Sequence, residues 1–130
     1  MQLPIKVLGM SLMLMVVTGG GIAVAQAQGT IKIVTSWPMQ GAMIPEGTAM
    51  KQAVDLAVKH QGGAVGGFKI EVVNRDDASP TTGSWDGTVE AEIAQKAVAD
   101  PDVMVYLATY NSGAAKISMP ITNKVGLVQI

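Results

Sequence analysis

Apolar residues along the chain follow two different spacings, and the two spacings alternate. Short β-branched or alternating runs predict four strands, at 31–36, 68–77, 103–108 and 126–130. Apolar residues three and four positions apart predict three helices between these strands, at 46–63, 86–101 and 112–124. This alternation is typical of a parallel sheet built from right-handed crossovers, with helices on both faces. The predicted fold class is therefore α/β.

Local signals set the ends of the predicted helices. Gly62 and Gly63 follow the apolar stripe of the first helix, and Pro101 stops the second. Pro120 lies inside the third predicted helix, where a proline removes one backbone hydrogen bond and clashes with the preceding turn. We therefore expect the third helix to kink or restart at this residue.

The first 27 residues do not fit the strand and helix pattern. Lys6 precedes an apolar run that reaches Val17, and Ala25-Gln26-Ala27 forms a small-x-small site. These features predict a secretory signal peptide that is cleaved after Ala27. The alternative is a membrane anchor, although the glycines at 19–21 interrupt the run that a spanning helix would need. The mature chain, 28–130, is accordingly predicted to be periplasmic.

Composition narrows the class of protein further. The 130 residues carry a formal net charge of −1 and include no cysteine. The charge gives no electrostatic footprint for nucleic acid or an anionic membrane. Without a thiol, neither a disulfide nor a lipid anchor on cysteine can form, so packing alone must stabilise the exported protein. We expect a monomer that needs no cofactor.

The stretch LATYNSGAAKISMPI, at 107–121, carries the best candidate for a binding site. Its polar turn at 109–114 follows the third predicted strand, and in open parallel sheets ligands bind at the carboxyl ends of strands. A helix that begins near Ser112 offers unpaired N–H groups and a partial positive charge, and Gly113 keeps the approach free of bulk. Ser112 can donate its hydroxyl to a carboxylate, or it can be a plain helix N-cap.

Three further residues are candidates for the wall of a ligand cleft. Tyr110 and Asn111 flank the serine, and each can either line the cleft or fix the turn. Trp37, on the predicted loop after the first strand, can stack on a ligand or cover a local apolar patch. Trp85 is interpreted differently, as a residue that closes its own loop onto the domain.

Chemistry other than binding finds little support. The acidic pair Asp76 and Asp77 is interpreted as making turn and cap hydrogen bonds rather than a metal or phosphoacceptor site. His60 has no partner at a telling spacing and is expected on the surface. The nucleophile elbow, the zinc-binding H-E-x-x-H and the P-loop motifs are missing from the sequence. We predict that the protein is not an enzyme and has no metal site.

The chain resembles the ABC-transporter periplasmic substrate-binding proteins of the branched-chain amino acid type. The resemblance rests on IKIVTSWPMQG, EGTAMKQAVDLAV, GGAVGGFKIEVVNRDDASPTTGSWD and AQKAVADPDVMVYLATYNSGAAKISMPITNKVGLVQI. It implies two α/β lobes that close around an amino acid or similar small carboxylate and deliver it to a membrane permease. It also implies the strand order 2-1-3-4 in each lobe. A sensory ligand-binding domain, which uses the same design, is the alternative.

The same resemblance assigns roles to single residues. Ser112 matches the serine that grips the ligand carboxylate, and Gly41 and Gly47 match glycines of a loop that borders the side-chain pocket. Glu46 stands where several members have an aromatic residue. The resemblance implies that 28–130 is a partial N-terminal lobe and that the second lobe is absent. We therefore expect residues 28–130 to bind amino acids very weakly or not at all, which micromolar affinity for an amino acid in calorimetry would contradict.

Overall fold

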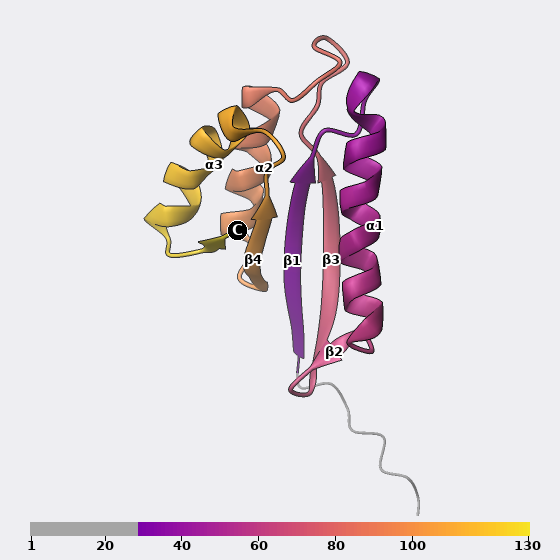
Figure 1. Cartoon of the computed structure of the whole chain (residues 1–130). Helices are drawn as coiled ribbons and strands as arrows, with labels where there is room; N and C mark the ends of the chain where they lie inside the picture. The colour runs from indigo at the N-terminus through magenta and orange to yellow at the C-terminus, as the bar shows by residue number, and fades with distance from the viewer. Residues whose placement is uncertain (1–28) are drawn as a thin grey trace, which may run out of the picture.

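The computed structural model describes residues 29–130, so the predicted signal peptide lies outside the described residues. Figure 1 shows a central sheet with helices on both sides. The elements in chain order are β1 (Gly29–Trp37), η1 (Gly41–Met43), α1 (Ile44–His60), β2 (Ala64–Val65), β3 (Phe68–Asp76), α2 (Gly87–Ala99), β4 (Val103–Ala108), α3 (Ser112–Lys124) and β5 (Val128–Gln129). These elements confirm the predicted α/β class.

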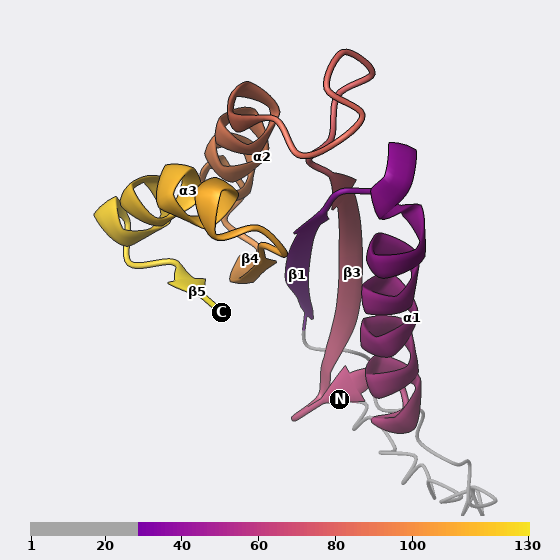
Figure 2. The same cartoon turned by 45° about the horizontal axis from the view of Figure 1, so that its top comes forward.

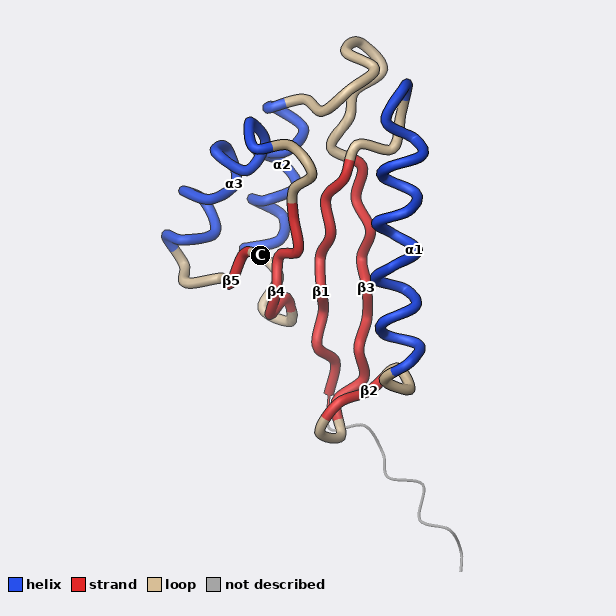
Figure 3. Tube along the Cα trace, viewed as in Figure 1, coloured by secondary structure: helices blue, strands red, loops and turns tan. Residues whose placement is uncertain are grey.

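The sheet has the order β2-β3-β1-β4-β5 (Figure 3). Strands β3, β1, β4 and β5 pair in parallel. The four predicted strands, which are β1, β3, β4 and β5, thus stand in the expected order 2-1-3-4. The two-residue strand β2 was not predicted; it pairs antiparallel with β3 and extends the edge of the sheet. Glycines at positive φ on both sides of β2 allow the tight hairpin that turns the chain back into β3.

The two crossovers lie on opposite faces of the sheet. The chain leaves β1 for β3 on one side and then returns from β3 to β4 on the other side of β1. Right-handed connections therefore place α1 over one face and α2 over the other, as Figure 2 shows. The helix α3 packs beside α2 on that second face. The core lies between the sheet and these two helices, and it contains Val34, Ile93, Ala94, Ala97, Val103, Tyr106 and Ala108.

The predicted restart of the third helix at Pro120 is wrong, because α3 runs as one helix from Ser112 to Lys124. Pro120 and Lys116 are both exposed, so water can reach the Lys116 carbonyl that the proline leaves without its helical hydrogen bond. The last strand was predicted from residue 126, but β5 (Val128–Gln129) begins later because Gly126 has a positive φ and still belongs to the turn after α3. Ile130, the next residue, still exchanges backbone hydrogen bonds with β4. Within residues 29–130, no helix combines the length and apolar character needed to cross a membrane.

Candidate functional site

The carboxyl ends of β1, β3 and β4 meet at one edge of the sheet, and α2 and α3 both begin there (Figures 1 and 2). Strand β1 lies between β3 and β4, so the two crossovers diverge at its carboxyl end. Open parallel sheets bind ligands at such a point because the loops on either side separate and leave a crevice. The turn 109–111 and the start of α3 therefore occupy the position expected of a binding site.

The first turn of α3 leaves its backbone donors available. Asn111 is the N-cap residue, with an extended backbone and no capping hydrogen bond from its side chain. The first intrahelical bond runs from the Ala115 N–H to the Asn111 carbonyl. The N–H groups of Ser112, Gly113 and Ala114 come before this bond, and within residues 29–130 they have no acceptor. Ser112 is the first helical residue and is exposed, so the N-cap interpretation of this serine is wrong.

A groove of about 960 Å³ opens beside this helix start. It runs along α3 toward β5, and both Tyr110 and Ser112 line it. Lys116 is the one charged side chain among its lining residues, and the other lining side chains are uncharged. Because Ser112 and a lysine line the groove and no acidic side chain does, the groove suits an anion that carries an apolar group. The lining residues are Ala108, Thr109, Tyr110, Ser112, Ala115, Lys116, Met119, Pro120, Thr122, Asn123, Leu127, Gln129 and Ile130.

Asn111 and Trp37 do not line this groove. The Asn111 side chain is inaccessible at Nδ2, which has no hydrogen-bond partner among the described residues. Trp37 was expected on a loop, but it is the last residue of β1 and is only 6% exposed. The parallel pairing with β3 extends to Trp37 and draws the residue into the sheet. Its placement on a loop is therefore wrong.

Gly113 faces an aromatic ring, although it was expected to leave an open approach. A Cβ built on Gly113 would lie 2.5 Å from Cζ2 and 2.7 Å from Cη2 of Trp85. Only a residue without a side chain tolerates a ring at this distance. The backbone of Trp85 also forms a bridge with Ala78, which confirms that Trp85 closes its loop onto the domain.

Gly41 and Gly47 also mark close contacts of the protein with itself. A Cβ on Gly41 would lie 2.2 Å from the Gly83 carbonyl oxygen, and Gly41 has a φ of 59°. A Cβ on Gly47 would lie 2.3 Å from the Pro38 carbonyl oxygen. The loop after β1 therefore contacts the loop that carries Trp85. The two loops lie together at the end of the sheet where the carboxyl ends of the strands meet.

A buried polar cluster lies behind the site, and it was not predicted. Glu90, in the first turn of α2, is fully buried; its Oε2 accepts a 2.6 Å hydrogen bond from Ser36, and its Oε1 accepts a 2.8 Å bond from Tyr106. Burial raises the pKa of Glu90, and the hydrogen bonds oppose that rise. Burial, with the nearby Glu90 charge, also raises the pKa of Tyr106. The one signal in the sequence was the four-residue spacing of Glu90 and Ala94 along α2, which puts the glutamate on the buried side.

The two neighbouring aspartates have different environments. Asp76 fulfils the predicted turn role: its Oδ1 accepts hydrogen bonds from the N–H groups of Met39 (2.8 Å) and Ala78 (3.0 Å), and its Oδ2 accepts one from Gln40. For Asp77 the same prediction is wrong, because its carboxyl is buried and neither oxygen has a partner among the described residues. Burial, reinforced by the charges of Glu90 and Asp76, raises the pKa of Asp77 to about 7.

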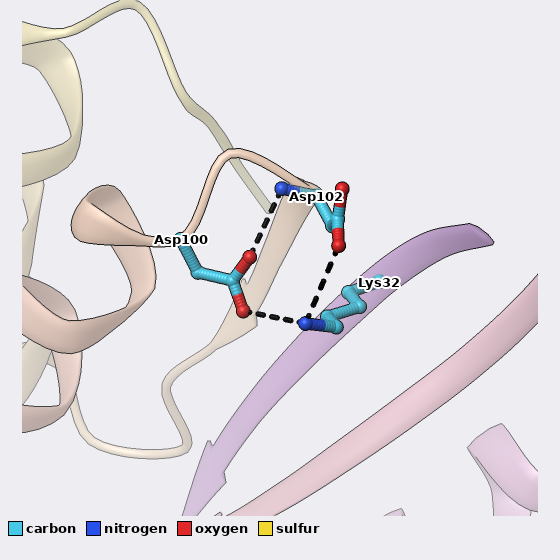
Figure 4. A network of polar contacts seen from close by, with 3 residues as sticks. All are labelled: Lys32, Asp100 and Asp102. Carbon is cyan, nitrogen blue, oxygen red and sulfur yellow. Dashed lines mark hydrogen bonds and ion pairs between the residues drawn. The ribbon is translucent and has the colours of Figure 1, made fainter. Parts of the chain in front are cut away.

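A separate cluster of charged residues lies at the opposite end of the sheet, away from the candidate site (Figure 4). Lys32 Nζ lies 2.7 Å from Asp100 Oδ2 and 3.6 Å from Asp102 Oδ2. The hydrogen bond to Asp100 raises the pKa of Lys32, and the same bond lowers the pKa of Asp100. The cluster joins the turn between α2 and β4 to β1, so its role is structural. Among residues 29–130, no three acidic or histidine side chains are grouped so that they could hold a metal ion.

The fold agrees with what the chain matches among known proteins. The chain belongs to the periplasmic binding protein family, whose pattern matches residues 30–129. This confirms the resemblance drawn from the sequence. A comparison with curated proteins gave no match.

Several solved structures of ABC-transporter binding proteins share the fold. The LivJ protein of the branched-chain amino acid transporter from Streptococcus pneumoniae, in complex with isoleucine, is 26% identical with a TM-score of 0.65; the match covers 77% of this chain and 28% of that one. A solute-binding protein from Rhodopseudomonas palustris, in complex with 3,4-dihydroxybenzoic acid, is 26% identical with a TM-score of 0.67, covering 77% and 26%. Another from R. palustris, in complex with benzoate, is 28% identical with a TM-score of 0.66, covering 78% and 26%. The chain thus spans about a quarter of the length of each.

Proposed function

We propose that the chain is part of the N-terminal lobe of an exported solute-binding protein, which serves an ABC uptake transporter. It binds a small carboxylate, either an amino acid of the branched-chain type or an aromatic acid, and the complete protein delivers this solute to a permease in the membrane. Its role is binding rather than catalysis, and its location is the periplasm.

The observation that carries this proposal is the start of α3. The N–H groups of Ser112, Gly113 and Ala114 have no acceptor among residues 29–130, and the exposed Ser112 lines a groove without acidic side chains. A carboxylate can accept hydrogen bonds from these donors and is favoured by the positive end of the helix dipole. The ligands of the three structures above, which are isoleucine, dihydroxybenzoic acid and benzoate, differ in shape but share a carboxylate.

Backbone amide NMR of the ¹⁵N-labelled chain tests this role at residue resolution, because it detects weak binding. Titration with benzoate or isoleucine should shift the amide signals of Ser112, Gly113 and Ala114, with a dissociation constant on the order of millimolar. The affinity should be low because this chain offers one wall of a cleft. Benzamide and isoleucinamide, which lack the carboxylate, are the matched control ligands and should leave these signals in place.

Two variants sharpen the titration. Ser112→Ala should weaken carboxylate binding by roughly tenfold or more, since it removes one hydrogen bond to a charged group. Thr81→Ala changes an exposed hydroxyl on the loop between β3 and α2 and should bind as the wild type does. Equal shifts with benzoate and benzamide, or shifts that avoid residues 112–114, would refute the proposal.

A further inference from the structure

The indole of Trp85 lies between the first turns of two helices. On one side, its Cζ2 and Cη2 atoms lie against Gly113, the second residue of α3. On the other side, its Cζ3 atom lies 3.8 Å from the position of a Cβ on Gly87, the first residue of α2. Trp85 therefore fills the space between the two helix starts at the carboxyl edge of the sheet.

The loop that carries Trp85 is itself held in place. The Ser79 N–H donates to the Ser84 carbonyl, and the Thr82 hydroxyl donates to the same oxygen at 2.6 Å. After the tryptophan, the Asp86 N–H donates to the Asp77 carbonyl at 2.7 Å, and the Asp86 side chain caps α2. The indole is thus presented to α3 by a loop whose own backbone bonds fix its path.

The residue types at the two contacts are informative. Glycine inside a helix is about 1 kcal/mol less favourable than alanine, so a glycine in the first turn of α3 needs a structural reason. At Gly113 the reason is the ring, because a methyl group there would overlap Cζ2. At Gly87 a methyl group would make only ordinary van der Waals contact. The two glycines face one indole but differ in how closely it approaches.

We propose that Trp85 is a positioning residue for the carboxylate-binding start of α3. Its ring supports the backbone at Gly113 from behind, so that the N–H groups of residues 112–114 keep a fixed direction toward the groove. Trp85 acts through the backbone and does not line the groove. This inference rests on the proposed function for the identity of the ligand, while the packing of Trp85 is independent of it.

The first experiment tests the packing with the two glycines as a matched pair. Gly113→Ala should lower the melting temperature by about 5–10 °C, because the ring must move, whereas Gly87→Ala should change it by less than about 2 °C. Combining Gly113→Ala with Trp85→Phe, which shortens the ring, should recover most of the loss. Equal effects of the two alanine variants, or no recovery in the double variant, would overturn the contact.

The second experiment tests positioning itself. Trp85→Ala should weaken benzoate binding by at least about threefold and lower the NMR order parameters of residues 112–114 below the rigid value of about 0.85. Val103→Ala, which removes core volume at the other end of β4, should lose stability but keep both the affinity and the order parameters. Wild-type affinity in Trp85→Ala would overturn the inference. Failure of the wild type to bind any carboxylate would instead refute the proposed function. The order parameters of residues 112–114 in Trp85→Ala would then show by themselves whether Trp85 holds the start of α3 in place.

Discussion

The two faces of the sheet are packed very differently. Helix α1 contributes a single buried residue, Gly47. Helices α2 and α3 bury seven residues against the other face, which are Glu90, Ile93, Ala94, Ala97, Ala114, Ser118 and Thr122. The candidate site stands on the closely packed face. A binding site needs donors held in fixed directions, and packed elements provide such support better than a loosely covered helix does.

The largest expected effect comes from a comparison of one large apolar residue on each helix, Ile93 on α2 and Leu56 on α1. Ile93→Ala on α2 should lower the free energy of unfolding by about 2–4 kcal/mol, because Ile93 is 8% exposed and its loss leaves a cavity. Leu56→Ala on α1 should cost less than about 1 kcal/mol, since Leu56 is 52% exposed. Urea denaturation followed by circular dichroism measures both variants. Similar losses would show that α1 is packed as firmly as α2.

The second test uses pH and the buried carboxyl of Asp77. Its pKa of about 7 in the folded state lies above the ordinary value of 3.8, so the folded protein holds this proton more tightly than the unfolded chain does. The stability that depends on this proton is complete below about pH 4 and is lost as the pH rises through about 7. Asp77→Asn should therefore be more stable than the wild type at pH 8, by roughly 2–4 kcal/mol, and nearly equal at pH 4.

The control for the pH test is a variant of the neighbouring aspartate, Asp76. Asp76→Asn should destabilise at pH 8, because Asp76 accepts three hydrogen bonds as a carboxylate. The ionisable groups that face Asp77 are Glu90, Asp76 and Tyr106. Because the pKa of Glu90 is also raised, the stability of Asp77→Asn should still fall as the pH rises, but less steeply than that of the wild type. Urea titrations between pH 4 and pH 8 give the comparison. An unchanged pH dependence in Asp77→Asn would contradict the assignment.

The smallest effect is expected at the far end of the sheet. Lys32→Met breaks the ion pairs with Asp100 and Asp102 and should lower the melting temperature slightly at low salt, less so at high salt. Lys51→Met removes an ion pair with Asp55 within one turn of α1 and should have a still smaller effect. Melting curves at two ionic strengths measure both. A larger loss for Lys51→Met would reverse the ranking of the two faces.

Regular features of this fold could be predicted from the sequence. Hydrophobic spacing gave the three helices and four strands, because a buried stripe repeats along each element. The strand order came from the family resemblance. Strand β2 escaped prediction because two exposed residues, Ala64 and Val65, show no period. Its pairing depends on the glycine turns around it.

The site was predictable in position but less so in detail. The turn before Ser112 follows from the rule for parallel sheets, whereas the contact between Trp85 and Gly113 joins residues that are far apart in the sequence. The fully buried Glu90 resembles an ordinary acidic residue in the first turn of a helix. Asp77 follows Asp76 directly, just after β3 ends, and nothing in the sequence separates the hydrogen-bonded carboxyl from the isolated one.

The central position of β1 in the sheet has a consequence for how the binding specificity of such a protein can evolve. Strand β1 pairs with β3 from Gly29 to Trp37 and with β4 from Lys32 to Ser36, so three loops leave one edge of a sheet whose alignment is already set. Substitutions or length changes in those loops can alter which solute fits while the strands keep their alignment. The architecture therefore lends itself to evolutionary diversification of solute preference, and to loop grafting in the laboratory.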